Sequence, residues 1–573
     1  MNKPYRNIIR RTLLLAAALG LFAGLQARTS DEQPARAVFN VFTYRADGSL
    51  IGNTYGFFTR ADGTGITSYQ LFVGASRAEV IDAQGNKLPV SRILGASSTM
   101  DLLKIRVETK KPTDFLPVAT ASAREGSELL LVNYSTKKKT PPTGIRIEKA
   151  TDFNGNGYYD LSAANAERNF GCPLVNAAGE AVAIVQKNVG RDAKTACALD
   201  AKAAEGLKIT TTSALNSDLT RLQIPRILPE SEKDALSYVY MLRAAPEAVQ
   251  QAALDDFIAA FPDNAEGYVN RGNFLGGLEG KREEARSDFG AALERAENAA
   301  STMKTDEVHH ALSKLLFRWA LTAQAEDFNA LCEEALAEEE AAYAAEPNPL
   351  YLQQQAEILI MSDRLPEALA RLKDFNRSDL TTPESLYREV QVLQAMDADS
   401  LTVLAAMDKV IAKMEKPYSS PQAAAYILAR AMQRVRLGMN RDAIQDFNEY
   451  EKIVGPQQLS HNFYYVREQT ERQARMFQQA LDDIRSAEAR SSGEDYDLYR
   501  LEEMSLLVQV QLNDEAIACG EDLLRRLPDE GLVHRLLGVA YGEKGEKSRA
   551  QEHLRRAAAL GETNLEPLMN KYK

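Results

Sequence analysis

The chain has 573 residues, which is more than one hydrophobic core supports, because cores stop growing at about 250 to 300 residues. Its composition, 45% hydrophobic and 26% charged, excludes a disordered or collagen-like chain. The net charge of -12 argues against a nucleic-acid partner, since phosphate backbones are bound by clustered Lys and Arg. We therefore expect at least two globular domains, and we interpret the basic run Lys137 to Lys139 as a solvated loop.

The N-terminus has the layout of a secretory signal peptide. Basic residues precede an apolar run from Leu13 to Leu25, and small residues end the run near Ala27. The run is shorter than the about 20 apolar residues of a membrane span, and no later stretch of the sequence is long and apolar enough to be one. We expect residues 1–27 to be cleaved and the protein to be exported to the bacterial periplasm, not integrated in the membrane. An uncleaved anchor is the alternative.

Residues 37–215 contain short apolar runs separated by turn signals. The runs include AVFNVFTY, LLKIRVE and AVAIVQK, and Asp-Gly, Gln-Gly and Asn-Gly pairs lie between runs. Alternating runs at this spacing predict an all-β barrel or sandwich. Residues 216–234, which include IPRILPESEKD, are expected to be a linker, because the composition changes after them.

Residues 235–573 are predicted to be helical, because apolar residues recur every three and four positions. The last repeat contains Gly538 and Ala550, which let two helices approach, and Tyr541 and Leu554, which fill the space between them. Earlier equivalents of Ala550 recur in steps of 34 to 38 residues, at Ala516, Ala480, Ala443, Ala405 and Ala368. The pattern resembles tetratricopeptide (TPR) repeats. The resemblance implies an all-α solenoid of about eight to nine helix pairs, whose concave face binds a protein or peptide partner.

The β half resembles the trypsin-like serine peptidases, in particular the Deg/HtrA branch, at four places in the family's order. These are GNTYGFFTRADGTGITSYQLFVGA, STMDLLKIRV, NFGCPLVNAAGEAVAIVQ and ACALDAKAAEGL. The resemblance spans residues 40 to 215. It implies a trypsin-like double barrel whose cleft would carry a Ser-His-Asp triad.

Carried onto this sequence, the triad is degenerate. The histidine position falls on Gln70, the aspartate position on Asp101 and the serine position on Phe170. The family's oxyanion-hole glycine falls on Arg168, whose side chain disfavours a backbone conformation that glycine adopts freely. The β half also lacks an imidazole base, since every histidine lies in the helical half. The five histidines are His309, His310, His461, His534 and His553.

The four cysteines leave several alternatives open. Cys172 and Cys197 lie in the same predicted domain, and three alternatives remain for them. They are joined in a disulfide, both are buried free thiols, or Cys172 acts as a substitute nucleophile. A nucleophilic role requires a lowered thiol pKa. Cys332 and Cys519, in the helical half, are expected to be buried apolar thiols.

The stretch DFNGNGYYD matches part of a calcium-binding loop. Asp152, Asn154, Asn156 and Asp160 stand at positions 1, 3, 5 and 9 of an EF-hand-like pattern, but Ala163 occupies position 12, where Glu belongs. Asn-Gly between two β runs is also a hairpin signal. We expect a hairpin, with a calcium loop as the weaker alternative, and no cofactor.

Together these patterns favour an exported, non-catalytic protein that binds or scaffolds protein partners in the cell envelope. One alternative is an active peptidase that uses Gln70, Asp101 and Cys172. The other is a purely structural subunit of an envelope assembly.

Overall fold

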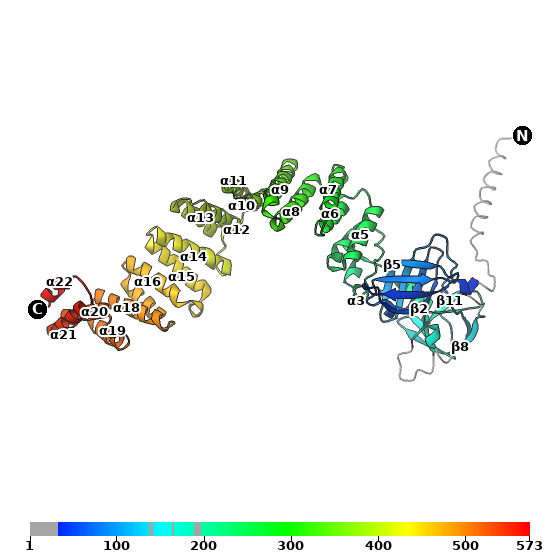
Figure 1. The fold of residues 1–573 in the computed structure, drawn as a ribbon, viewed down its shortest axis with the longest axis horizontal. Coiled ribbons are helices and arrows are strands. Elements are labelled where there is room, and N and C mark those ends of the chain that lie inside the picture. Colours follow the sequence, from blue (N-terminus) through cyan, green and yellow to red (C-terminus); the bar gives the residue numbers. More distant parts are fainter. Residues whose placement is uncertain (1–32, 137–140, 163–165, 188–195) are drawn as a thin grey trace. The chain divides into compact units, whose positions relative to one another are not determined.

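The protein was analysed as a computed structural model, which describes residues 33–136, 141–162, 166–187 and 196–573 (Figure 1). The predicted signal peptide, Lys137 to Lys139 and Ala163 lie outside these ranges. The chain forms two compact units, one ending at Val308 and the other running from His309 to Lys573. Within the described ranges, we find no helix that is both long and apolar enough to cross a bilayer.

The first unit contains two closed β-barrels of six strands each (Figure 1). The first barrel has the strand order β1-β2-β3-β6-β5-β4, and the second has the equivalent order β7-β8-β9-β12-β11-β10. The first is formed by β1 (Val38–Tyr44), β2 (Leu50–Phe58), β3 (Thr64–Thr67), β4 (Arg77–Ile81), β5 (Lys87–Ser97) and β6 (Leu102–Val107). The second is formed by β7 (Glu128–Leu131), β8 (Thr143–Phe153), β9 (Asn156–Leu161), β10 (Pro173–Val175), β11 (Ala181–Gln186) and β12 (Ala196–Asp200).

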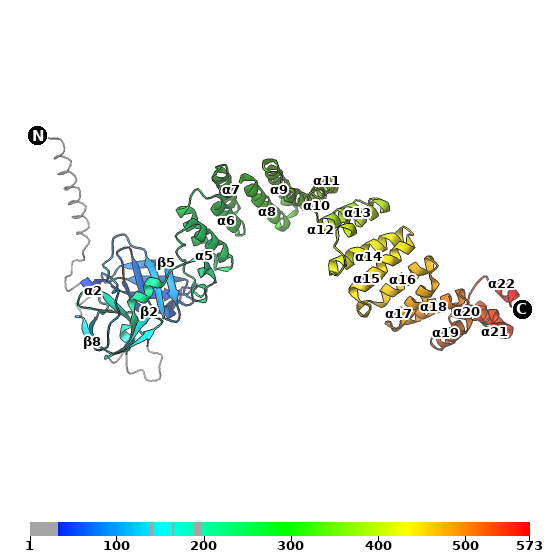
Figure 2. The ribbon, with the colours of Figure 1, turned by 180° about the vertical axis from the view of Figure 1, so that it is seen from behind.

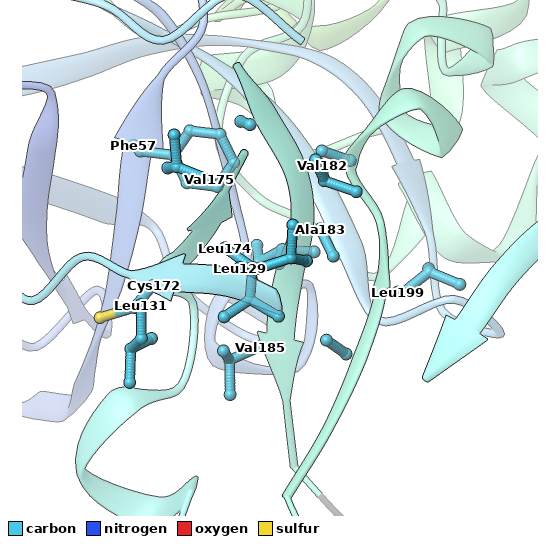
Figure 3. Close-up of a cluster of buried hydrophobic side chains, with 14 of the residues drawn as sticks. Phe57, Leu129, Leu131, Cys172, Leu174, Val175, Val182, Ala183, Val185 and Leu199 are labelled. Atoms are coloured by element: carbon cyan, nitrogen blue, oxygen red, sulfur yellow. The ribbon is translucent and has the colours of Figure 1, made fainter. Parts of the chain in front are cut away.

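The second barrel is filled by apolar side chains from β7, β10, β11 and β12. Figure 3 shows Leu129, Leu174 and Val185 gathered in this cluster, with Phe57 of β2 at its border. Each fully buried Val or Leu contributes about 1.5 to 3 kcal/mol relative to an exposed one. Because Phe57 belongs to the first barrel, this cluster also joins the two barrels.

The core of the first barrel continues into the residues that follow the barrels. Phe39 and Ile105 share one buried cluster with Leu222, with Tyr238 of α4 (Glu232–Met241) and with Phe257 of α5 (Glu247–Ala260). A β-bridge between Ile93 and Arg226 adds a parallel contact with β5. The segment expected to be a linker, residues 216–234, is therefore packed against the first barrel and contains a short helix, α3 (Ser217–Thr220).

Among the described residues, eighteen helices follow α3 in nine consecutive pairs, and a short helix ends the chain. After α4 and α5 come α6 (Ala265–Leu275), α7 (Arg282–Ala296), α8 (Thr305–Thr322), α9 (Ala325–Ala345), α10 (Pro349–Met361), α11 (Leu365–Phe375), α12 (Pro383–Ala395), α13 (Ser400–Lys413), α14 (Pro421–Arg436), α15 (Asn440–Val454), α16 (His461–Gln473), α17 (Phe477–Glu488), α18 (Glu494–Gln509), α19 (Asn513–Arg526), α20 (Gly531–Glu543), α21 (Lys547–Ala559) and α22 (Glu566–Lys571). Figure 2 shows α14 beside α15 and α16 beside α17. The predicted fold class, a double β-barrel that fits the trypsin-like type followed by an all-α solenoid, is confirmed.

The turns inside the helix pairs share one backbone feature. In seven pairs, the turn contains a residue with positive φ, which ends the first helix and redirects the chain. Glycine adopts this conformation without steric cost, whereas for other residues it is unfavourable by about 1 to 2 kcal/mol. The seven residues are Gly280, Asp363, Asp397, Gly438, Arg475, Gln511 and Gly545.

The repeated alanines lie where the two helices of a pair meet. Ala550, Ala516, Ala480, Ala443 and Ala368 are all completely buried. The prediction that Ala405 is the equivalent of Ala550 is wrong, because the side chain of Ala405 is exposed and that of the neighbouring Ala406 is buried instead. Since residues one apart on a helix point about 100° apart, only one of two adjacent alanines can face the partner helix.

Candidate functional site

Asp101 and Gln70 meet at the end of β3, but through the backbone of Gln70. Gln70 opens a single 3-10 turn, Gln70–Phe72, and its main-chain N–H donates to Asp101 Oδ1 at 2.8 Å. The Ser68 hydroxyl donates to the same carboxylate, with Oγ 2.9 Å from both oxygens. Burial raises the pKa of Asp101, and these hydrogen bonds oppose that rise. Asp101 is therefore bound by a local amide and a hydroxyl.

The Gln70 side chain is exposed. A carboxamide does not take up a proton near neutral pH, so it cannot act as the general base that a serine or cysteine nucleophile needs. In the triad, an imidazole takes that proton and the aspartate orients it. Gln70, which the sequence analysis matched to the histidine position, therefore supplies no base beside Asp101.

Phe170 is fixed to the first barrel by its main chain. Its carbonyl oxygen accepts hydrogen bonds from Tyr55 N and from Thr54 Oγ1, both at 3.1 Å. The half-buried ring packs against the apolar cluster of the second barrel, which contains Cys172. The residue that the sequence analysis matched to the serine position is thus an aromatic residue packed on the second barrel.

Gly171 makes this attachment possible. Its φ of +79° is in the left-handed region, and a Cβ built on it would lie 1.8 Å from Tyr55 O. Its N–H donates to Val185 O at 2.9 Å, and Cys172 N donates to Asn169 O at 3.0 Å. These two amides are therefore used within the fold. Arg168, which the sequence analysis matched to the oxyanion-hole glycine, is exposed at the end of the turn Ala166–Asn169.

Cys172 and Cys197 are separate, buried free thiols, so the disulfide that we considered between them is absent. Cys172 belongs to the apolar interior of the second barrel. On β12, Ala196 and Ala198 face that interior, and Cys197 between them faces the opposite side of the sheet, where its Sγ donates to Gln186 O at 3.5 Å. Two thiols on opposite faces of a sheet cannot bond without moving the backbone.

The environment of Cys172 opposes a nucleophilic role. Burial raises the pKa of its thiol to about 12, with a small opposing effect of a backbone hydrogen bond from Tyr134. A reactive cysteine needs the opposite shift, because the thiolate is the attacking species. In the helical half, Cys332 and Cys519 are also buried free thiols.

The calcium-like stretch forms the β8–β9 hairpin. Asp152 pairs with Gly157 across the ladder, and Asn154 and Gly155 form the two-residue turn with φ of 55° and 78°. The Asp152 carboxylate accepts a hydrogen bond from Gly155 N at 3.2 Å, and Asn156 begins β9. Asp160 lies farther along β9, opposite Cys197 of β12. In the part of the chain that the structure describes, no group of three or more His, Cys, Asp or Glu is arranged to hold a metal ion.

Two residues of this site were missed by the sequence analysis. Ser68 stands two positions before Gln70, and its role could have been suspected from that spacing alone. Asp218 of α3 gave no such signal. Its carboxylate accepts from Ser98 N at 2.9 Å, and its carbonyl accepts from the Tyr69 hydroxyl at 2.9 Å. Asp218 therefore holds both the loop before Asp101 and the turn before Gln70.

No family model matches the chain, and no curated protein matches it. Among solved structures, the Rv3671c protease from M. tuberculosis in its active form is similar, with 17% identity and a TM-score of 0.26. The match covers 35% of this chain and 85% of that chain. Because the identity and the TM-score are this low, the fold assignment rests on the order of the strands in the two barrels.

Proposed function

We propose that this chain is a non-catalytic relative of the trypsin-like peptidases, joined to a TPR-type solenoid, and that it binds or scaffolds protein partners. The observation that carries the proposal is the Asp101 carboxylate, which is engaged by the Gln70 main chain and the Ser68 hydroxyl. The Phe170 ring, packed on the apolar cluster, supports the same interpretation. The signal-peptide pattern of residues 1–27 favours export to the periplasm.

The close approach of paired helices supports the TPR assignment. A Cβ on Gly538 would lie 2.7 Å from Leu554 Cγ, and one on Gly272 would lie 2.9 Å from the Phe289 ring. At both glycines the second helix of the pair approaches more closely than a side chain would allow. Arrays of this kind bind protein segments along stacked helices and have no inherent chemistry.

An assay of proteolysis tests the proposal. The mature chain is incubated with casein and with fluorogenic peptides, beside trypsin as a positive control and a Cys172→Ala variant. We expect no cleavage above the buffer rate for either form. Cleavage that disappears in Cys172→Ala would establish the alternative of an active peptidase with an atypical nucleophile.

A second experiment separates binding of clients from a purely structural role. Crosslinking in cells followed by mass spectrometry identifies the proteins that contact the chain. Many crosslinked clients, each in small amount, would support binding and scaffolding. One stoichiometric complex that survives purification would instead support a structural subunit.

A further inference from the structure

A groove of about 700 Å³ lies on the first barrel, in the range of about 300 to 1,000 Å³ that is typical of ligand sites. One wall comes from Arg60, Thr64 of β3 and the side chains of β6. The other walls come from residues 207–212 and 227–231, together with Asp234. Thr64 begins β3, and Gln70 follows the far end of that strand, so the groove is separate from the degenerate triad.

Two cations of the groove project from β6 on the outer face of the barrel. Leu103, Ile105 and Val107 belong to the buried core, so Lys104 and Arg106, which alternate with them, face outward. Although it faces outward, Lys104 is only 9% exposed, because the neighbouring segments cover its stem. A buried ammonium group is costly unless it is paired and hydrogen-bonded.

The carboxylates around these cations leave them incompletely satisfied. Glu205 Oε2 lies 3.8 Å from Lys104 Nζ, beyond hydrogen-bond distance, and the same oxygen pairs with Arg60 at 3.2 Å. Asp62 pairs with Arg106 at 3.0 Å, yet the buried Arg106 Nε has no hydrogen-bond partner. Burial also lowers the pKa of Lys104, with Glu205 opposing that shift.

The acidic residues of the opposite wall, Glu230 and Asp234, form no ion pair with Lys104 or Arg106 in the described part of the structure. Asp234 accepts hydrogen bonds from Ser231 Oγ at 2.7 Å and Thr211 Oγ1 at 2.9 Å, which join two walls of the groove. Glu230 is exposed. A fourth cation, Lys208, also lines the groove. At the barrel wall, three cations, Arg60, Lys104 and Arg106, therefore face the two carboxylates Asp62 and Glu205.

The groove also has an apolar part. Its apolar lining comes from β5 and from the two segments that follow the barrels, and it consists of Leu94, Leu207, Ile209, Ile227, Leu228 and Pro229. A site that combines apolar walls with a few convergent polar groups suits a ligand with an apolar body and one charged group. Here the charged group must be an anion.

We propose that this groove binds the terminal carboxylate of an extended peptide whose last side chain is apolar. Lys104 and Arg106 contact the carboxylate, and the apolar walls cover the side chain. A carboxylate is planar and accepts the paired N–H donors of a guanidinium, and Arg106, whose side chain is 36% exposed, presents a guanidinium at the groove. The proposal goes beyond the proposed function, because it holds whether or not the triad is inactive.

Fluorescence anisotropy tests it with the mature full-length chain and a fluorescein-labelled peptide, Gly-Ser-Gly-Ala-Val-Leu, that has a free C-terminal carboxylate. We expect saturable binding, and binding weakened about tenfold or more when the peptide ends in an amide, since hydrogen bonds to charged groups are worth about 1.5 to 3 kcal/mol. Lys104→Met and Arg106→Gln should each weaken binding to a similar extent. Lys110→Gln removes an exposed cation that does not line this groove and should leave binding unchanged.

Lys104→Met keeps the length of the stem and removes a buried charge, so the variant is expected to fold, and circular dichroism checks this. Equal binding of the amide and the free-acid peptides would overturn the proposal. Unchanged affinity in folded Lys104→Met would do the same. Displacement of the peptide by inorganic phosphate at a concentration where acetate has no effect would exclude a carboxylate site.

Discussion

The guanidinium of Arg92 on β5 donates two hydrogen bonds of 2.7 Å to the two carboxylate oxygens of Asp256 on α5. The side chains are 28% and 33% exposed, so the pair is largely shielded from water. It joins a strand of the first barrel to the first pair of helices. Bidentate geometry of this kind is stronger than that of a typical surface ion pair.

A double-mutant cycle measures this link. We expect Arg92→Met and Asp256→Asn each to lower the free energy of unfolding of the first unit, with a coupling energy of about 1 kcal/mol between them. Denaturant unfolding of the full chain, followed by tyrosine fluorescence, provides the values. A coupling energy near zero would show that the two side chains act independently.

Gly171→Ala should be strongly destabilising. The new Cβ would meet Tyr55 O at 1.8 Å in addition to the strain of a positive φ, and we expect a loss of about 3 kcal/mol or more. Gly179→Ala is the matched control, because Gly179 has a φ of +80° and open space around its Cβ position. It should cost about 1 kcal/mol. Equal losses in thermal unfolding would contradict the close contact with β2.

Asp101 should tolerate replacement by Asn but not by Ala. Its side chain accepts a hydrogen bond from Gln70 N, and its φ of 45° is one that Asn and Asp adopt more readily than Ala. Asp101→Asn keeps an acceptor, whereas Asp101→Ala leaves a main-chain donor unpaired at a cost of about 1 to 3 kcal/mol. Urea unfolding compares the two variants. A smaller loss for Ala than for Asn would refute this account of Asp101.

The stability of α16 and α17 should fall as the pH rises. Burial raises the pKa of Glu468 from 4.5 to about 7, opposed by Arg472, and that of Glu471 to about 8, with further raising by Asp483. The folded state therefore holds these protons more tightly than the unfolded state does. This contribution is fully present below pH 4.5 and is lost as the pH rises through 7 and 8. We expect a loss of about 4 kcal/mol between pH 6 and pH 9.

Hydrogen exchange of peptides from α16 and α17, corrected for the intrinsic effect of pH, measures this dependence in the full chain. The double variant Glu468→Gln and Glu471→Gln imitates the protonated side chains. Its protection should fall less over the same range, with a remaining slope from Glu488 of α17, whose pKa burial raises to about 8. An equal slope in the variant and the unmodified chain would assign the pH dependence to other groups.

Arg475→Gly should stabilise the second unit. Arg475 adopts a φ of 60° in the turn between α16 and α17, where glycine has no steric cost, and the gain is expected to be about 0.5 to 1 kcal/mol after the greater flexibility of unfolded glycine is subtracted. Arg555→Gly, in the interior of α21, is the control and should destabilise by about 1 kcal/mol. Thermal unfolding of both variants shows the sign. A lower midpoint for Arg475→Gly would contradict this explanation.

The periodic parts of the fold could be predicted from the sequence, because they repeat. Buried alanines such as Ala480 and Ala516 mark helix pairs at nearly constant steps, and the short apolar runs of residues 37–215 predicted an all-β barrel or sandwich, which the structure shows to be two barrels. The exact position of the buried alanine within each helix was harder to predict. Two adjacent alanines, Ala405 and Ala406, fit the period about equally well, and only packing decides which of them is buried.

The contacts made by residues far apart in the chain could not be predicted. Asp218 accepts a hydrogen bond from Ser98 N, which lies 120 positions earlier in the chain, and no local sequence pattern indicates this contact. Lys104 in LLKIRV looks like an ordinary outward-facing residue of a strand until residues 207–212 cover it. Gln70 and Asp101 were matched to the triad positions by the resemblance alone, whereas the hydroxyl of Ser68, which also donates to Asp101, was not foreseen.

The apolar cluster that joins the first barrel to α4 and α5 bears on the order in which the chain is made. The core of the second barrel draws on residues no later than Leu207. The core of the first barrel also includes Phe257, which follows Phe39 by 218 positions in the chain. A chain growing from its N-terminus thus holds every residue of the second core before it holds every residue of the first. The barrel that is synthesised first is the one that is completed last.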